Sequence, residues 1–122
     1  MVSQINSPYI NVGDIVLIRF PQADLKQGKL RPALVVAISP SRHPDLLLAL
    51  ISSQLHQATP DFDEIINPSD PDYITSGLKT TSVIRLGRLI SVEASVINAH
   101  LGSISSLRLI KIRKSLINWL QI

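Results

Sequence analysis

The chain of 122 residues contains no cysteine, and it has only one tryptophan, two tyrosines and two phenylalanines. Without cysteine, neither a disulfide framework nor a thiolate-bound metal site can form. Aromatic residues make up only 4% of the chain, so base stacking on aromatic platforms is expected to be limited in any nucleic-acid complex. The lack of cysteine also fits a reducing compartment.

Long apolar runs are missing as well. No run approaches the roughly 18 residues of a membrane-spanning helix. Residues 1–14 carry neither the basic region nor the apolar stretch of a signal peptide. We therefore expect a soluble, cytoplasmic protein with no membrane partner.

Several enzyme signatures are absent too. The chain has no glycine-rich nucleotide loop, no nucleophile elbow and no zinc-protease motif. The three histidines, His43, His56 and His100, show no metal-ligand spacing. These absences predict an activity that needs no cofactor and no metal.

What the sequence does contain is apolar residues and an uneven charge. Hydrophobic residues make up 45% of the chain and charged residues 17%, which predicts one folded domain over 1–122. Residues 1–75 hold five lysines and arginines against eight acidic residues, whereas residues 76–122 hold seven against one. The basic second half suggests a polyanion or an acidic partner, although for the helical charges alone a solvated helix face is the favoured explanation.

Period-two alternation and turn residues predict strands at 15–20, 31–39, 46–56, 61–67 and 81–92. The polar residues 22–30 read as an exposed loop, 61–67 as a short edge strand, and 93–103 as a short helix that ends at Gly102.

The period changes near the C-terminus. From Ser105 onward, Leu109, Ile112, Leu116 and Leu120 recur at helical spacing, which predicts an amphipathic helix packed on the sheet, with Ser105 or Ser106 as its N-cap. The fold class that follows is α+β and mainly β: a small, strongly curved antiparallel barrel with a C-terminal amphipathic helix.

Three polar residues interrupt the apolar strands. Arg31 precedes Pro32 at the start of one strand, Ser52 lies near the end of the next, and Arg85 lies inside a third. Proline suits a strand start because it has no N–H to leave unpaired there. Alternation places Val83, Arg85 and Gly87 on one face of their strand. A guanidinium among branched apolar residues faces either solvent or an anion, and the pattern leaves both open.

The segments GDIVLIRF, RPALVV, LALISS, SVIRLGRLISV and LGS occur in this order before the terminal helix. Over nearly the whole chain this arrangement resembles the MazF/PemK/Kid family of toxins from type II toxin–antitoxin systems. The resemblance implies an SH3-like barrel that forms a homodimer and a metal-independent endoribonuclease that cleaves single-stranded RNA. It also implies inhibition by a cognate antitoxin, whose C-terminal segment lies across the active groove.

Carried over by position, the resemblance assigns catalytic roles to Arg31, Ser52 and Arg85. In such an enzyme the 2′-OH of the RNA is the nucleophile, so the protein has to align the attack and stabilise charge on the phosphate oxygens. We expect His56 to be a possible base. Residues expected to contact RNA are Lys29, Ser53, Gln54, Arg88 and Ser91.

Two positions depart from the family pattern. Family members often have Asp or Glu where this chain has Gly87, and they usually have Arg or Lys where it has Ile90. Arg88 lies on the face opposite Arg85 unless the strand bulges at Gly87. An alternative is therefore a non-catalytic inhibitor on the same barrel, either similar to gyrase poisons or a module that only binds an antitoxin, or a degenerate member without ribonuclease activity. Neither the cleavage sequence nor the identity of the antitoxin can be read from these residues.

Overall fold

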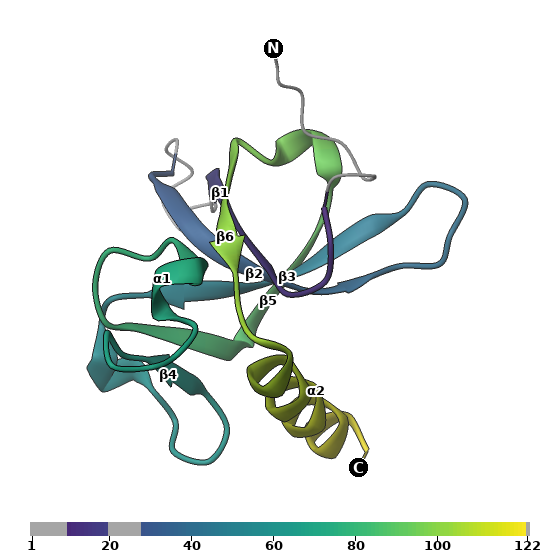
Figure 1. Cartoon of the computed structure of the whole chain (residues 1–122). Coiled ribbons are helices and arrows are strands. Elements are labelled where there is room, and N and C mark those ends of the chain that lie inside the picture. Colours follow the sequence, from purple (N-terminus) through teal and green to yellow (C-terminus); the bar gives the residue numbers. More distant parts are fainter. Residues whose placement is uncertain (1–9, 20–27, 122) are drawn as a thin grey trace.

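The structure is a computed structural model, and it describes residues 10–19 and 28–121. Its described elements follow the chain in this order: β1 (Asp14–Arg19), β2 (Leu30–Ile38), β3 (Asp45–Ser52), the 3-10 helix η2 (Leu55–Gln57), β4 (Glu64–Ile66), α1 (Tyr73–Ser76), β5 (Ser82–Glu93), the 3-10 helix η3 (Ala94–Val96), β6 (Ala99–Ser103) and α2 (Ser106–Leu120). Figure 1 shows a curled sheet with α2 leaving it after β6. The expected loop 22–30 lies largely outside the described residues.

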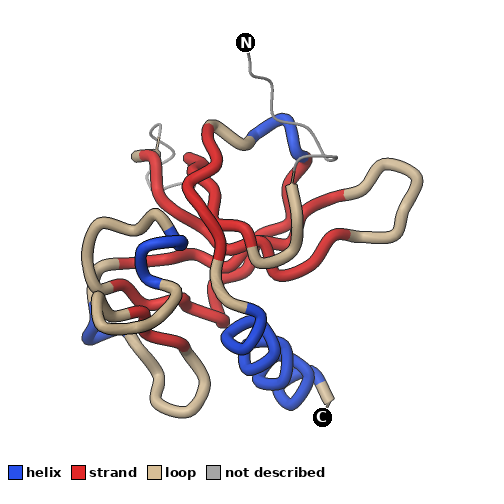
Figure 2. Tube along the Cα trace, in the orientation of Figure 1, coloured by secondary structure: helices blue, strands red, loops and turns tan. Residues whose placement is uncertain are grey.

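The strands form one antiparallel sheet in the order β4-β5-β3-β2-β1-β6. The expected curved, mainly β fold with a C-terminal helix is confirmed, and so is the edge strand within 61–67. Among the described residues β4 and β6 do not pair, so the sheet is an open half-barrel. The turn between β2 and β3 projects from its body (Figure 2).

The sheet buries apolar side chains on both faces. The helix-covered face holds a core cluster with Leu34, Ile51 and Ile84, against which Ile112 and Leu116 of α2 pack. The opposite face holds a second core cluster, which includes Ile18, Ala33, Val35, Leu48 and Leu50 and is completed by Ile10 and Ile97. Successive side chains of β2 point to opposite faces of the sheet, and each face has its own core, so successive residues of β2 are apolar.

Strand β5 changes register against β3 in its middle. Arg85 is opposite Leu50 and Leu89 is opposite Ala49, so residues 86–88 have no partner on β3. Leu86 and Leu89 both contact the helix-covered core although they are three residues apart. A bulge therefore reverses the side-chain alternation around Gly87.

Helix α2 begins at a capped residue and is tied to the β4–α1 region. Ser105 Oγ accepts a hydrogen bond from the N–H of Arg108 at 3.2 Å, which confirms Ser105 as the N-cap. The Arg108 guanidinium donates to Asp72, Asp70 and Glu64 at 2.9–3.1 Å. The Arg108 hydrogen bond lowers the pKa of Asp72 to about 2. This partly buried network fixes where α2 leaves the sheet.

One secondary-structure prediction and one packing prediction near the C-terminus were wrong. The region 93–103 is not a helix: η3 covers only Ala94–Val96, and β6 then pairs with β1. Gly102 is needed for a different reason, since a Cβ there would collide with the carbonyl of Thr75 in α1. Leu120, expected to pack on the sheet, is 72% exposed.

Candidate functional site

Arg31, Ser52 and Arg85 lie on one face of three neighbouring strands. The register that pairs Ala33 with Leu50 brings Arg31 of β2 opposite Ser52 of β3, and Arg85 of β5 is opposite Leu50. Directly opposite residues point to the same side of a sheet, with Cβ atoms about 5 Å apart, and diagonal neighbours are about 7–8 Å apart. The sheet therefore gathers side chains that are far apart in the sequence.

The guanidinium of Arg85 is partly held and partly unsatisfied. Its Nη1 donates to Oε1 of Gln57 in η2 at 3.3 Å, whereas its buried Nε has no hydrogen-bond partner among the described residues. A buried donor without a partner is unfavourable. The guanidinium carries five N–H donors, so its terminal nitrogens keep N–H groups that can donate to an acceptor such as a phosphate oxygen.

Ser52 is buried with its oxygen already engaged. Its Oγ accepts a hydrogen bond from the N–H of Gln54 at 3.0 Å, which leaves its hydroxyl proton free to donate. The same hydrogen bond turns the chain out of the sheet, so β3 ends at Ser52 and not at residue 56 as predicted.

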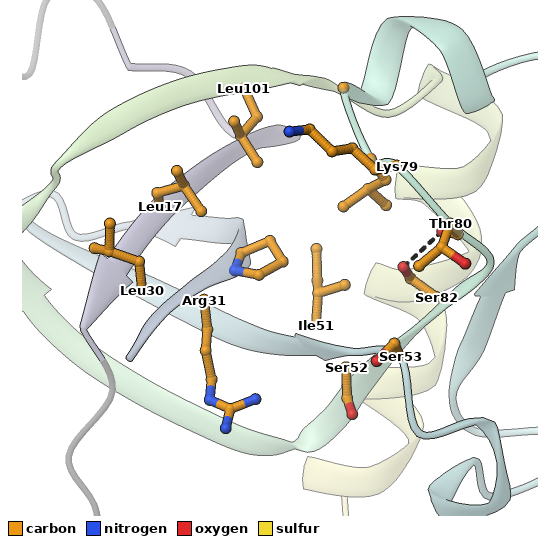
Figure 3. A pocket seen from close by; sticks show the side chains of 13 residues that line it. Leu17, Leu30, Arg31, Ile51, Ser52, Ser53, Lys79, Thr80, Ser82 and Leu101 are labelled. Atoms are coloured by element: carbon orange, nitrogen blue, oxygen red, sulfur yellow. Dashed lines mark hydrogen bonds between the residues drawn. The ribbon is translucent and has the colours of Figure 1, made fainter. Parts of the chain in front are cut away.

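A pocket of about 370 Å³ lies beside these strand ends, with Arg31 and Ser52 at its edge. Leu17, Pro32, Ile51, Leu78 and Leu101 form most of its apolar lining. In Figure 3 the Arg31 guanidinium and the Ser52 hydroxyl point to the same side, away from Leu17 and Leu101. The two polar groups thus face outward from the rim, and not into the apolar interior.

The other expected RNA contacts divide into two groups. Lys29 directly precedes β2, and Ser53 and Gln54 directly follow β3, so all three are exposed near the rim. Arg88 is exposed in the bulged stretch of β5. The bulge at Gly87 is the condition under which we expected Arg88 to leave the face opposite Arg85.

Ser91 is not brought to this group. It pairs with Leu47, which packs against the helix-covered core, so Ser91 lies on the other face from Arg85. Ile90 packs against the second core cluster, on the face opposite the helix, which explains why an apolar residue stands at this position. The bulge upstream reverses the side-chain alternation of β5, so Ser91 lies on the opposite face from Arg85.

His56 is exposed on the 3-10 helix η2, so it does not belong to the strand predicted over 46–56. Its neighbour Gln57 holds Arg85, and Asp63 accepts hydrogen bonds from the N–H groups of Leu86 and Thr59. The sequence analysis missed Gln57 and Asp63, since neither lies in a motif. Each oxygen of Asp63 accepts one backbone hydrogen bond, so this carboxylate holds β5 to the loop before β4.

Gly87 lies in the bulged stretch between Arg85 and Arg88. A Cβ there would meet only Phe62, at 3.8 Å, which is ordinary van der Waals contact. The position therefore has room for a side chain, and no close backbone approach requires glycine.

Among residues 10–19 and 28–121, no group of three or more His, Asp or Glu side chains could hold a metal ion. In the same part of the chain no helix is both long and apolar enough to cross a membrane.

A family profile matches residues 11–120 of this chain. The family is described as PemK-like, MazF-like toxin of type II toxin–antitoxin system. No curated protein matches the sequence significantly.

Solved structures of similar fold were also found. The Mycobacterium tuberculosis toxin MazF-mt6 is 13% identical with a TM-score of 0.65, covering 89% of this chain and 97% of that one. An endoribonuclease from a mycobacterial species is 16% identical with a TM-score of 0.61, covering 93% and 96%. A mycobacterial endoribonuclease in complex with its cognate antitoxin is 17% identical with a TM-score of 0.60, covering 90% and 93%. At these identities the likeness concerns the fold.

Proposed function

Because the chain belongs to the PemK-like, MazF-like toxin family of type II toxin–antitoxin systems, we propose that it is an endoribonuclease that cleaves single-stranded RNA without a metal ion. The observation that carries this proposal is the shared face of Arg31, Ser52 and Arg85. Two guanidinium groups and one hydroxyl on adjacent strands are the donor set that a phosphodiester needs.

In the proposed reaction the 2′-OH of the RNA attacks the adjacent phosphorus. The bond from phosphorus to the 5′-oxygen breaks, which leaves a 2′,3′-cyclic phosphate and a 5′-OH. Arg31 and Arg85 stabilise the charge on the non-bridging oxygens, and the free proton of Ser52 donates to one of them. The 2′-OH loses its proton to a base and the 5′-oxygen gains one. His56 is the candidate base, because η2 carries it beside the Gln57 that holds Arg85.

The partners of this activity are single-stranded RNA, a cognate antitoxin and a second copy of the chain. One similar structure is described as an endoribonuclease in complex with its cognate antitoxin, which supports an antitoxin as partner here. We place the complex in the cytoplasm, where RNA is available.

The test is cleavage of a long RNA in EDTA by the purified chain and by Arg31→Ala and Arg85→Ala. Arg42→Ala is the matched control, since Arg42 is exposed in the projecting turn between β2 and β3. We expect fragments with 5′-OH ends from the original chain and the control, and a loss of about 100-fold or more in each arginine variant.

A non-catalytic inhibitor is the second candidate, and the absence of an acidic side chain at Gly87 favours it. Under that function, RNA stays intact in EDTA while expression of the chain still arrests growth. Arg31→Ala would then leave growth arrest unchanged, whereas it abolishes the arrest if RNA cleavage is the cause.

A further inference from the structure

The side chain of Arg85 is held by an uncharged partner. Its Nη1 donates to Oε1 of Gln57 at 3.3 Å, and it forms no ion pair within the part of the chain that the structure describes. An amide oxygen can orient a guanidinium without cancelling its charge, whereas a carboxylate does both. Arg85 therefore keeps its full charge available for an anion.

The direction of the Arg85 guanidinium is not one that its own side chain favours. Its Nε is buried and has no hydrogen-bond partner among the described residues. A rotation that brought Nε to water would satisfy this donor, so the observed direction needs a contact that holds it. The hydrogen bond to Gln57 is the contact that the structure provides, and it leaves N–H groups on both terminal nitrogens free.

Gln57 is itself fixed on both sides of η2. Before it, the N–H of Gln57 donates to the carbonyl of Gln54 at 3.0 Å, and the N–H of Gln54 donates to Oγ of Ser52 at 3.0 Å. After it, Asp63 accepts a hydrogen bond from the N–H of Leu86 at 2.9 Å, which ties this loop to β5. The amide of Gln57 therefore comes from a short segment that is attached to the sheet at two points.

We propose that Gln57 is a positioning residue, which holds the Arg85 guanidinium in the direction that a phosphodiester at Ser52 requires. This inference rests on the endoribonuclease function proposed above. Hydrogen bonds lead from Arg85 to the side chain of Gln57, from the N–H of Gln57 to Gln54, and from Gln54 to the Ser52 hydroxyl. One segment thus orients both groups before the substrate binds, and donors stabilise a transition state best when they are aligned in advance.

Two substitutions of Gln57 separate its acceptor oxygen from its size. Gln57→Met keeps the length of the side chain but removes the acceptor, so we expect kcat on a short RNA to fall by about 10–100-fold with little change in KM. Gln57→Glu keeps an acceptor and should retain more of kcat, while its negative charge raises KM by repelling the phosphates. Thr59→Ala, an exposed residue of the loop after η2, is the control and should match the original chain.

A double-mutant cycle distinguishes positioning from a general effect on folding. If Gln57 acts through Arg85, Gln57→Met has no further effect on kcat once Arg85→Ala is present. A residue that acts only through stability lowers the rate by the same factor in both backgrounds. Equal factors, corrected for the folded fraction of each protein, would overturn the proposal.

The direction of Arg85 can also be measured without RNA. The NMR signal of its Nε–H group is assigned as the one that Arg85→Lys removes. Because Nε is buried, this proton should exchange slowly with water in the original chain and in Gln57→Glu, and at least about tenfold faster in Gln57→Met.

This second measurement keeps the two proposals apart. Equal exchange in Gln57→Met and the original chain would overturn the role of Gln57 even in an active endoribonuclease. Exchange that differs as expected, in a chain that leaves RNA intact in EDTA, would support the hold of Gln57 on Arg85 and overturn only the endoribonuclease function.

Discussion

The carboxylate of Asp63 accepts a hydrogen bond at 2.9 Å from the N–H of Leu86, the first residue of the stretch in β5 that has no partner on β3. Asp63 thus replaces a missing strand neighbour one residue after Arg85. A loop far away in the sequence fixes the backbone on which the proposed catalytic guanidinium depends.

Asp63→Ala leaves the N–H of Leu86 without this acceptor. We expect the free energy of unfolding to fall by about 1–3 kcal/mol and RNA cleavage to fall further than the folded fraction does. Asp63→Asn keeps an acceptor oxygen and should retain more of both. Urea unfolding and initial cleavage rates measure the two effects, and equal rates per folded molecule in all three proteins would contradict the positioning role.

Ser52→Ala removes the free hydroxyl proton but little volume. If this proton donates to a phosphate oxygen in the transition state, kcat falls by about 10²–10³-fold while KM changes little. Ser53→Ala, one residue outside the sheet, should have a much smaller effect. Steady-state kinetics on a short RNA makes the comparison, and a rise in KM alone would assign Ser52 to substrate binding.

Gly87→Asp introduces a carboxylate where there is space for it. Because a Cβ at this position meets only Phe62 at ordinary distance, the variant should fold normally. The family resemblance implies a base or antitoxin-sensitive group here, so we expect cleavage to rise by about tenfold or more at neutral pH. Gly87→Asn is the matched control without charge. Equal rates in the two variants would show that the carboxylate adds nothing.

Asp72 gives the chain an acid-sensitive contact. Its pKa is lowered from 3.8 to about 2 by the Arg108 hydrogen bond, so it stabilises the fold above pH 3.8, and this contribution is lost as the pH falls toward 2. Asp72→Asn should therefore reduce the free energy of unfolding at pH 7 by about 2 kcal/mol. Denaturant titrations at several pH values should show the two proteins converging near pH 2. A difference that stays constant over this range would exclude ionisation as its cause.

Gly102→Ala tests the close approach of β6 to α1. A Cβ at Gly102 would overlap the carbonyl of Thr75, so we expect a loss of about 1–3 kcal/mol or more in stability. Gly87→Ala, where space exists, is the control and should be nearly neutral. Thermal unfolding compares the two, and similar melting temperatures would disprove the contact.

Most of the fold could be predicted from local pattern. Alternation and turn residues identified β1 to β5 because each has at least one buried face, and helical spacing with Ser105 identified α2. The errors arose where a contact overrides the pattern. The strand predicted to residue 56 ends at Ser52 because its hydroxyl accepts a backbone N–H, and β6 forms by pairing with β1.

The candidate site was less accessible from the sequence. Arg31, Ser52 and Arg85 could be named, but their common face depends on the registers between three strands. Gln57 accepts a hydrogen bond from Arg85, 28 residues later, and Asp63 accepts one from Leu86, 23 residues later. A local sequence pattern cannot predict contacts between residues so far apart.

The unpaired stretch 86–88 has a consequence for how this fold can vary. In an ordinary strand, an insertion or deletion of one residue turns every following side chain to the other face of the sheet. In β5 the residues before and after 86–88 pair with β3 in separate registers, so a change within 86–88 does not alter the register of either half. The exposed residues of this stretch, Gly87 and Arg88, can therefore diverge among relatives while both cores keep their packing.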